Sequence, residues 1–331
     1  MIAAARRFTC AADEVWRLQR GSEADCVFFQ RMVNGGERIT DRGSRQGTWI
    51  CAPGGVVLAR TGSRDPDQVL ATFERAWAAW EELPEEAKRV PEDAGLEPEH
   101  RWEASYPEDG LALERIGREL PPEGLDGPPS PRWNRDYAWF SAAEIRGLVP
   151  HEARAGATFE LPLVAERLAR FHLVDNVRGQ SLPFAPEELA EARLTATVLA
   201  RDGGRLTLSL AGRTSATAEG PWLLGHNLWK PRKELPHGLD CELAGTATYD
   251  LGAGAFERFE LVALGSRWGR TQLNGRGRDA SPGFVAFHLD LAPPGRRIAP
   301  TFVAVYDADW IAHPAVPTWL ESPAECGLEA R

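Results

Sequence analysis

Apolar and polar residues alternate most clearly in residues 241–269, which predict a β-hairpin. In CELAGTATYD, Leu243, Ala247 and Tyr249 share one face, because successive side chains of a strand point to opposite faces. The turn DLGAGA contains two glycines, which adopt positive φ without strain. The returning residues 256–264 are apolar on both faces, which predicts a central strand covered from both sides. A lone hairpin is barely stable in water, so a larger antiparallel sheet is expected.

Similar patterns recur after Trp133 and predict a mainly antiparallel β domain over residues 133–331. LTATVLARDGGRLTLSLAG (194–212) predicts a second hairpin that turns at Asp-Gly-Gly. GFVAFHLDLA, further along, predicts another strand. Hairpin-connected strands of this kind are typical of an antiparallel barrel or sandwich.

The first 83 residues mix helix and strand patterns. TWICA (48–52) and VVLART (56–61) predict two strands joined by a Pro-Gly-Gly turn. Asp65 precedes Pro66 and an apolar stripe, which predicts a capped helix. Ser22, with Asp25 three residues later, predicts an earlier helix.

A proline-rich, acidic stretch separates the two patterned regions. Residues 84–132 have a composition that cannot bury a core, so they are predicted to be a linker. A short helix is predicted within it at 110–119. The chain is therefore expected to be α+β, with domains at 1–83 and 133–331 joined by the linker 84–132.

The segment GTWICAPGGVVLARTGSRDPDQVLATFERAWAAW (47–80) resembles the second half of a thioredoxin-like domain. The shared order is a strand, a Pro-Gly turn, a second strand and a terminal helix, and the resemblance extends over residues 5–83. It implies a partial thioredoxin-like α/β domain, degenerate or N-terminally truncated. The family's activity rests on a CxxC motif and a cis-proline, whereas this chain has no CxxC and holds Gln46 and Gly47 at the proline position. Dithiol–disulfide exchange is therefore not implied.

The charge balance restricts the expected partners. The formal net charge is -10, which disfavours binding to nucleic acid or anionic membranes. No apolar run is long enough to cross a bilayer, and the start MIAAARRFTC lacks the apolar segment of a secretory signal. We expect a cytoplasmic protein, with the reservation that a misplaced start could hide an export signal. A small molecule or a protein is the expected partner, and the oligomeric state stays open.

The five cysteines are scattered, which argues against a disulfide framework and a Cys-rich zinc site. Cys26 is predicted to lie in the first turn of a helix, where the helix dipole favours a thiolate. It is a candidate reactive thiol. The alternative is a small apolar residue packed beside Phe28 and Phe29.

RFHLVDN (170–176) is the densest polar cluster near a predicted strand. If this segment is extended, Arg170, His172 and Asn176 share one face. His172 with Asp175 suits acid–base catalysis or metal binding. The alternative is a structural, hydrogen-bonded histidine followed by a turn.

Other candidates carry weaker signals. His172 could join a metal site, but no HxH or HExxH spacing identifies ligands. No nucleophile elbow, dinucleotide fingerprint or P-loop occurs, so no cofactor is expected. The other histidines and acids considered for a metal are His226, His237, His288, Asp307, Asp309 and His313.

The loop 219–240 combines aromatic and cationic residues, a composition that suits an anionic or aromatic ligand. The alternative is a surface loop held by two buried tryptophans. Its candidate ligand-binding residues are Trp222, His226, Trp229 and Lys230.

Two functions follow from these observations. The favoured hypothesis is a non-catalytic, ligand- or partner-binding accessory protein with a degenerate thioredoxin-like domain. The alternative is an enzyme that uses Cys26 as a single reactive thiol, or a metal held around His172 and Asp175 in the β domain. The residues leave open whether the protein is an enzyme, whether it binds a metal and which ligand it takes.

Overall fold

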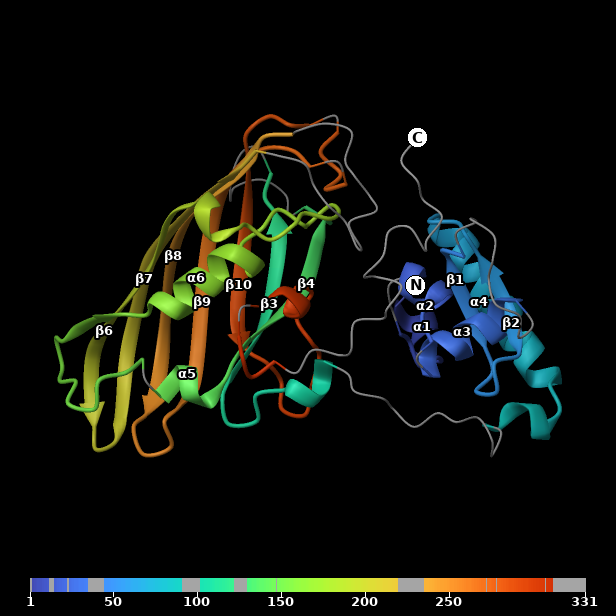
Figure 1. Cartoon of the computed structure of the whole chain (residues 1–331), viewed down its shortest axis with the longest axis horizontal. Coiled ribbons are helices and arrows are strands. Elements are labelled where there is room, and N and C mark those ends of the chain that lie inside the picture. Colours follow the sequence, from blue (N-terminus) through green and yellow to red (C-terminus); the bar gives the residue numbers. More distant parts are fainter. Residues whose placement is uncertain are drawn as a thin grey trace. The chain divides into compact units, whose positions relative to one another are not determined.

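The structure is a computed structural model of the chain. It describes residues 2–11, 15–22, 24–34, 45–90, 102–121, 130–146, 148–219, 235–271, 273–277, 279–306 and 308–311. These residues divide into two compact units, an N-terminal unit within residues 1–101 and a β unit that begins at Trp102 (Figure 1). In the described part of the chain, no helix is both long and apolar enough to cross a membrane.

The N-terminal unit packs a two-stranded hairpin against a long helix. Strands β1 and β2 pair in antiparallel, and helix α4 packs against them with Val69 and Ala76 buried. These three elements confirm the strands and the long helix predicted from the sequence. The elements of this unit are α1 (Ile2–Ala5), α2 (Val15–Arg20), α3 (Ala24–Asn34), β1 (Thr48–Cys51), β2 (Val57–Thr61), α4 (Pro66–Glu82) and the 3-10 helix η1 (Glu85–Lys88).

Helix α4 begins where its capping residues predict. The Asp65 side chain accepts hydrogen bonds from the main-chain N–H groups of Asp67 and Gln68, each at 3.0 Å. These bonds satisfy donors that have no partner inside the helix. The helix also holds the N-terminus through Phe8, whose ring lies 5.4 Å from that of Phe73.

The β unit is built on one eight-stranded antiparallel sheet with the strand order β4-β3-β10-β9-β8-β7-β6-β5. Its hairpins β6–β7 and β8–β9 confirm the two that were predicted. Among the described strands, β4 and β5 pair on one side only, so the expected barrel or sandwich is instead a single open sheet. The strands are β3 (Leu111–Glu119), β4 (Trp133–Phe140), β5 (Thr158–Glu160), β6 (Leu189–Asp202), β7 (Arg205–Ala218), β8 (His237–Asp250), β9 (Ala255–Gly269) and β10 (Gly283–Leu291).

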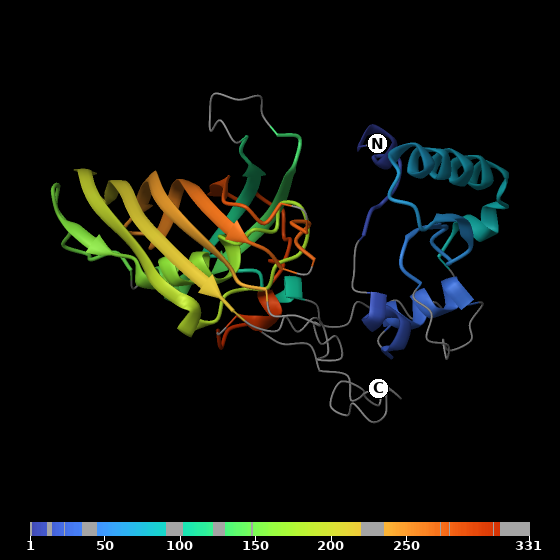
Figure 2. The ribbon, with the colours of Figure 1, turned by 90° about the horizontal axis from the view of Figure 1, so that it is seen from above.

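One face of this sheet carries the core. Helix α6 lies across that face, and the sheet curves around it (Figures 1 and 2). Buried residues of seven strands, β3, β4 and β6 to β10, form one cluster with Val164 and Leu168 of the helical segment. The helical elements of the unit are η2 (Trp102–Ser105), α5 (Ala142–Arg146), α6 (Pro162–Arg167), the π-helical turn η4 (Leu168–His172), η5 (Pro186–Glu188) and η6 (Val303–Val305).

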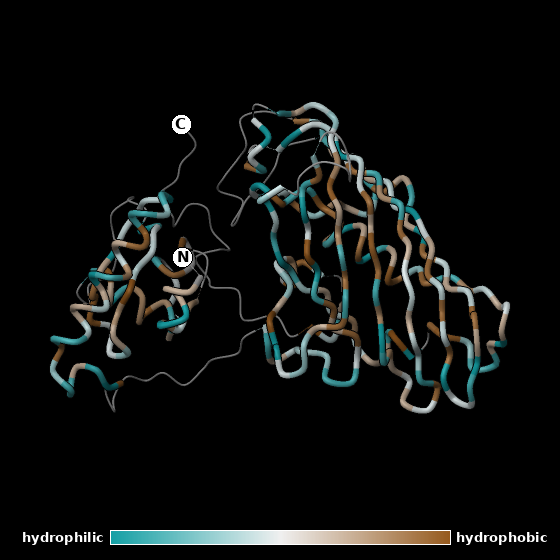
Figure 3. The backbone as a smooth tube through the Cα atoms, turned by 180° about the vertical axis from the view of Figure 1, so that it is seen from behind, coloured by the Kyte–Doolittle hydropathy of each residue, from teal (hydrophilic) through white to brown (hydrophobic). Residues whose placement is uncertain are grey.

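The other face of the sheet is exposed over β9. In β9, Val262 is 45% exposed and Leu264 is 43% exposed, so the prediction that 256–264 is buried on both faces was wrong. Hydrophobic and hydrophilic positions mix along the strands (Figure 3). Because α5 and α6 pack on one face only, these two apolar side chains of β9 remain exposed on the other face.

Residues 102–121, which the sequence placed in the linker, belong to the β unit. The helix predicted at 110–119 was wrong, because this segment is strand β3 with alternating burial. Its inward positions include Arg115 and Glu119, which are buried. Charged residues at inward positions conceal the alternation of apolar residues on which a strand prediction depends.

The helical segment is expected to contribute strongly to the stability of the β unit. Leu168 is completely buried among strand residues, so Leu168→Ala should lower the free energy of unfolding by about 2–5 kcal/mol. Urea unfolding followed by circular dichroism measures this. Leu199→Ala is the matched control, since Leu199 is 55% exposed. Equal effects of the two substitutions would contradict the assigned core.

Candidate functional site

The inner face of the sheet changes from apolar to charged along β3. Leu111 and Leu113 lie in the hydrophobic cluster. Further along the same face are Arg115, Gly117 and Glu119. Arg115 is 0% exposed and Glu119 is 8% exposed. Burying charge is costly unless each charged group is paired and hydrogen-bonded, so the partners of these residues define the polar end of the unit.

The Arg115 guanidinium connects three segments. It donates to the His172 carbonyl at 2.9 Å, to Asn134 Oδ1 at 2.5 Å and to Asn176 Oδ1 at 2.8 Å. Burial lowers the pKa of Arg115 to about 10, partly opposed by the charge of Asp136. The guanidinium is therefore still protonated at neutral pH and holds β3, β4 and the segment after η4 together.

Gly117 leaves the space that this arrangement needs. A β-carbon at Gly117 would come within 2.8 Å of both Arg115 Nη1 and Asn134 Oδ1. A larger residue would therefore force the guanidinium or the amide to move. The glycine therefore accommodates the close approach of these two side chains without displacing them.

A buried chain of hydrogen bonds runs from Asp136 through His172 to Tyr306. His172 Nδ1 lies 3.2 Å from Asp136 Oδ2, and His172 Nε2 lies 2.5 Å from the Tyr306 hydroxyl. Asp136 Oδ1 also accepts from the main chain and hydroxyl of Thr301, each at 2.9 Å. The Asp136 carboxylate accepts only, so the neutral imidazole carries its proton on Nδ1 and accepts from Tyr306 at Nε2.

Burial governs how these groups titrate. It lowers the pKa of His172, although the hydrogen bond to Asp136 and its charge partly oppose this. Burial also raises the pKa of Tyr306 well above its ordinary value. For Asp136, burial alone would raise the pKa, but hydrogen bonds from His172 and Thr301 and the charge of Arg115 lower it to about 2. At neutral pH the three hydrogen-bonded side chains are therefore one carboxylate, one neutral imidazole and one neutral phenol.

A second network of ion pairs closes the polar end of the interior. Arg276 is 0% exposed and binds both Asp175 oxygens at 2.9 Å. It also donates to Glu119 Oε1 at 2.5 Å. Arg178 donates to Glu119 Oε2 at 3.0 Å and lies 2.9 Å from Asp279. Paired, bidentate guanidinium–carboxylate contacts of this kind offset the cost of burying the charges.

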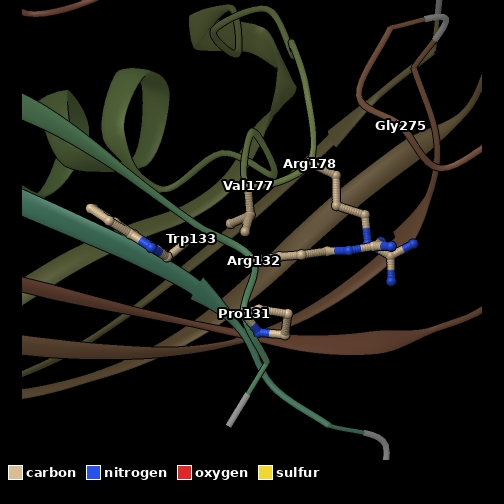
Figure 4. A pocket seen from close by; sticks show the side chains of 6 residues that line it. All are labelled: Pro131, Arg132, Trp133, Val177, Arg178 and Gly275. Atoms are coloured by element: carbon tan, nitrogen blue, oxygen red, sulfur yellow. The ribbon is translucent and has the colours of Figure 1, made fainter. Parts of the chain in front are cut away.

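An open pocket of about 410 Å³ adjoins this network. Arg132 and Arg178 direct their side chains toward the same part of it (Figure 4). Arg178 is held by carboxylates, but no described residue forms an ion pair or a side-chain hydrogen bond with the Arg132 guanidinium. The residues that line the pocket are Pro131, Arg132, Trp133, Val177, Arg178 and Gly275.

The structure places His172 and Asp175 in different networks. His172 faces Asp136 and Tyr306, whereas Asp175 binds Arg276. The extended conformation considered for residues 170–176 was wrong, because the segment starts in the π-helical turn η4 and continues as a loop. Both residues are engaged by protein groups, and their catalytic role stays a prediction.

The remaining candidates lie apart from these networks. Cys26 is in α3 and 0% exposed, so a reaction at its sulfur would require the surrounding structure to open, and its role stays a prediction. In the described ranges, no group of three or more His, Cys, Asp or Glu residues could hold a metal. Trp222, His226, Trp229 and Lys230, with Asp307 and His313, lie outside the described residues.

Sequence reasoning missed most of the residues that form the networks and the pocket. Arg115, Asp136 and Arg276 are buried but carry no local motif. One signal was available in β3. The alternation that begins with apolar residues at its inward positions continues with polar residues at the same parity. The other partners are far away in the sequence, so no spacing could have revealed them.

Comparison with known proteins gives no match for this chain among family models, curated proteins or solved structures. The site must therefore be interpreted from its own geometry.

The buried histidine is expected to make the protein less stable in mild acid. Below the ordinary pKa of 6.5 the unfolded chain takes up a proton at His172 that the folded protein resists. The free energy of unfolding should therefore fall as the pH drops below that value, and Asp136 adds a second loss below pH 3.8.

Urea unfolding between pH 8 and pH 5 tests this expectation. His172→Gln should flatten the profile, whereas His288→Gln should not, because the side chain of His288 is 43% exposed. A wild-type profile that stays flat down to pH 5 would show that His172 is protonated as easily in the folded state as in the unfolded chain.

The buried ion-pair network is expected to be sensitive to the loss of one partner. Arg276→Met leaves Asp175 and Glu119 without their buried guanidinium, which should destabilise the protein by about 3–5 kcal/mol. Arg205→Met is the control, because it removes a comparable pair with Glu257 at 2.7 Å on the exposed surface and should have a much smaller effect. Thermal unfolding of both variants measures the difference. Similar losses would mean that the Arg276 pairs are effectively solvated.

Proposed function

We propose that this chain is a non-catalytic accessory protein whose β unit binds an anionic ligand in the pocket at the start of β4. The observation that carries the proposal is the Arg132 guanidinium. It lines an open pocket, and no described residue pairs with it. A positive charge with no described partner, at the mouth of a pocket, attracts an anionic group.

The neighbouring residues support an anion as the ligand group. Arg178 presents a second guanidinium on the same side of the pocket (Figure 4). Its pairs with Glu119 and Asp279 fix the position of its side chain. Two guanidinium groups with planar N–H forks match the geometry of a carboxylate or a phosphate.

The pocket also has the size of a ligand site, and part of its lining is apolar. Its volume of about 410 Å³ lies within the range of small-molecule pockets. Pro131 and Val177 supply apolar surface beside the guanidinium groups. We therefore propose a ligand that combines an anionic group with an apolar part.

For the N-terminal unit we propose a degenerate thioredoxin-like domain that serves binding. The order β1, β2, α4 supports this proposal, since it follows the order that the resemblance implies. The lack of a CxxC motif in the sequence supports a role other than dithiol exchange.

A different enzyme alternative, beside the Cys26 thiol and the metal around His172, rests on one observation, the hydrogen-bonded series Asp136–His172–Tyr306. A carboxylate that orients a histidine, which in turn faces a hydroxyl, is an arrangement used in nucleophilic catalysis. His172 is 0% exposed and both of its ring nitrogens have partners inside the protein. This enclosure favours a structural role for the three hydrogen-bonded side chains. Binding is therefore the main proposal.

Removal of the Arg132 guanidinium is expected to weaken anion binding. N-acetylglutamate, titrated into the ¹⁵N-labelled full chain, should shift amide resonances around the pocket, and Arg132→Ala should raise its Kd about tenfold. Arg118→Ala is the matched control, because Arg118 is exposed on the neighbouring strand and pairs in register with Trp133. An Arg132→Ala protein that binds as tightly as wild type would refute the proposal.

A further inference from the structure

Strand β4 forms one edge of the sheet. It pairs with β3 along its length, from Trp133 opposite Arg118 to Phe140 opposite Leu111. No described strand pairs with its other side. The opposite edge strand β5 has only 3 residues, whereas β4 has 8. Short edge strands resist pairing with other chains, so β4 is the edge that could accept a partner.

Alternate residues of β4 direct their main chain away from β3. In an antiparallel pair, every second residue exchanges hydrogen bonds with the neighbouring strand. The carbonyl of Arg132 accepts from β3 at 3.3 Å. From the other side, Arg167 donates to the carbonyl of Trp139 at 3.0 Å. By this alternation, the N–H and C=O groups of Trp133 and Arg135 point to the free edge.

Only the first part of this edge is exposed. Tyr137 is 3% exposed and Trp139 is 0% exposed, whereas Trp133 is 45% exposed and Arg135 is also exposed. No described residue bonds to the main chain of Trp133 or Arg135 on the free side. Unpaired main-chain groups along an exposed strand are a template for an added strand.

The exposed part of the edge coincides with the pocket. Arg132 and Trp133 line it, and their side chains leave β4 on opposite sides (Figure 4). A strand laid beside β4 would direct alternate side chains to the side that holds Arg132 and Arg178. An acidic side chain at that position would meet both guanidinium groups.

We infer that the ligand of the pocket is an extended peptide segment with an acidic residue, which adds to the sheet as a further strand beside Trp133 and Arg135. This inference rests on the proposed function and names its ligand. Main-chain hydrogen bonds to the β4 edge provide general affinity, and the carboxylate in the pocket provides specificity.

A competing interpretation is that the edge is protected against pairing. Charged residues and proline on an edge strand discourage strand addition, and β4 carries Arg135 with Pro131 just before it. Arg135 is already engaged, since its Nε lies 2.7 Å from Glu114. A basic edge also repels cationic chains and attracts acidic ones. The two interpretations therefore differ in whether an acidic peptide binds to the edge.

The experiment uses the full chain and a fluorescein-labelled peptide, Thr-Val-Glu-Val-Thr with blocked ends, followed by fluorescence anisotropy. The peptide should bind, and replacing its Glu by Gln should weaken binding about tenfold through loss of the charge-assisted hydrogen bonds. One peptide is N-methylated at both valines and a second at the glutamate. Because strand pairing uses alternate N–H groups, one methylated peptide should lose binding and the other should retain it.

Two variants of the protein test the same edge. Arg135→Pro removes an N–H that does not bond to β3, which an edge strand tolerates, and it should abolish peptide binding. Arg135→Ala removes the side chain and keeps the N–H, so it should lose much less peptide binding than Arg135→Pro. Circular dichroism checks that both variants fold. If Arg135→Pro does not fold, the methylated peptides still test strand addition on the wild-type protein.

The outcomes separate this inference from the proposed function. If N-acetylglutamate binds in an Arg132-dependent manner but the peptide does not bind, strand addition is wrong and anion binding stands. Equal binding of the two methylated peptides also overturns strand addition. If neither N-acetylglutamate nor the peptide binds, both proposals fail.

Discussion

The polar half of the β unit depends on one buried guanidinium, that of Arg115. Its donors reach a main-chain carbonyl at His172 and the amide oxygens of Asn134 and Asn176. This side chain thus links the segment after η4 to β3 and β4, which also pair directly with each other. A buried charge is tolerated only when its donors are satisfied. The three oxygen atoms that accept from Arg115 must therefore stay in these positions.

The charged groups of the polar half lie in two places, a paired network in the interior and the exposed edge of the sheet. Inside, the carboxylates of Asp175 and Glu119 are matched by Arg276 and Arg178, which leaves the two carboxylates and Arg276 little capacity for a ligand. At the edge, Arg132 has no such partner among the described residues. The closed network holds Arg178 in place beside Arg132, so the interior positions the groups that we propose for binding.

The sequence predicted the elements whose pattern is local and missed those that depend on distant contacts. The hairpin β8–β9 and helix α4 follow from alternation and capping. Strand β3 was missed because Arg115 and Glu119 occupy inward positions. His172 was singled out because it lies in a polar cluster, but its hydrogen-bond partners lie 36 residues upstream and 134 residues downstream. No local pattern encodes such separations.

The strand order has a consequence for how the β unit can assemble. β3 and β4 come first in the unit, but they join the sheet only through β10, where Leu113 pairs with Leu291. The early hairpin therefore has no sheet to join until the last strand has been synthesised. Contacts between such distant residues generally slow folding, because a long loop must close before they form. During translation, the edge strand and its arginines would wait for almost the whole unit to emerge before they reach their final surroundings.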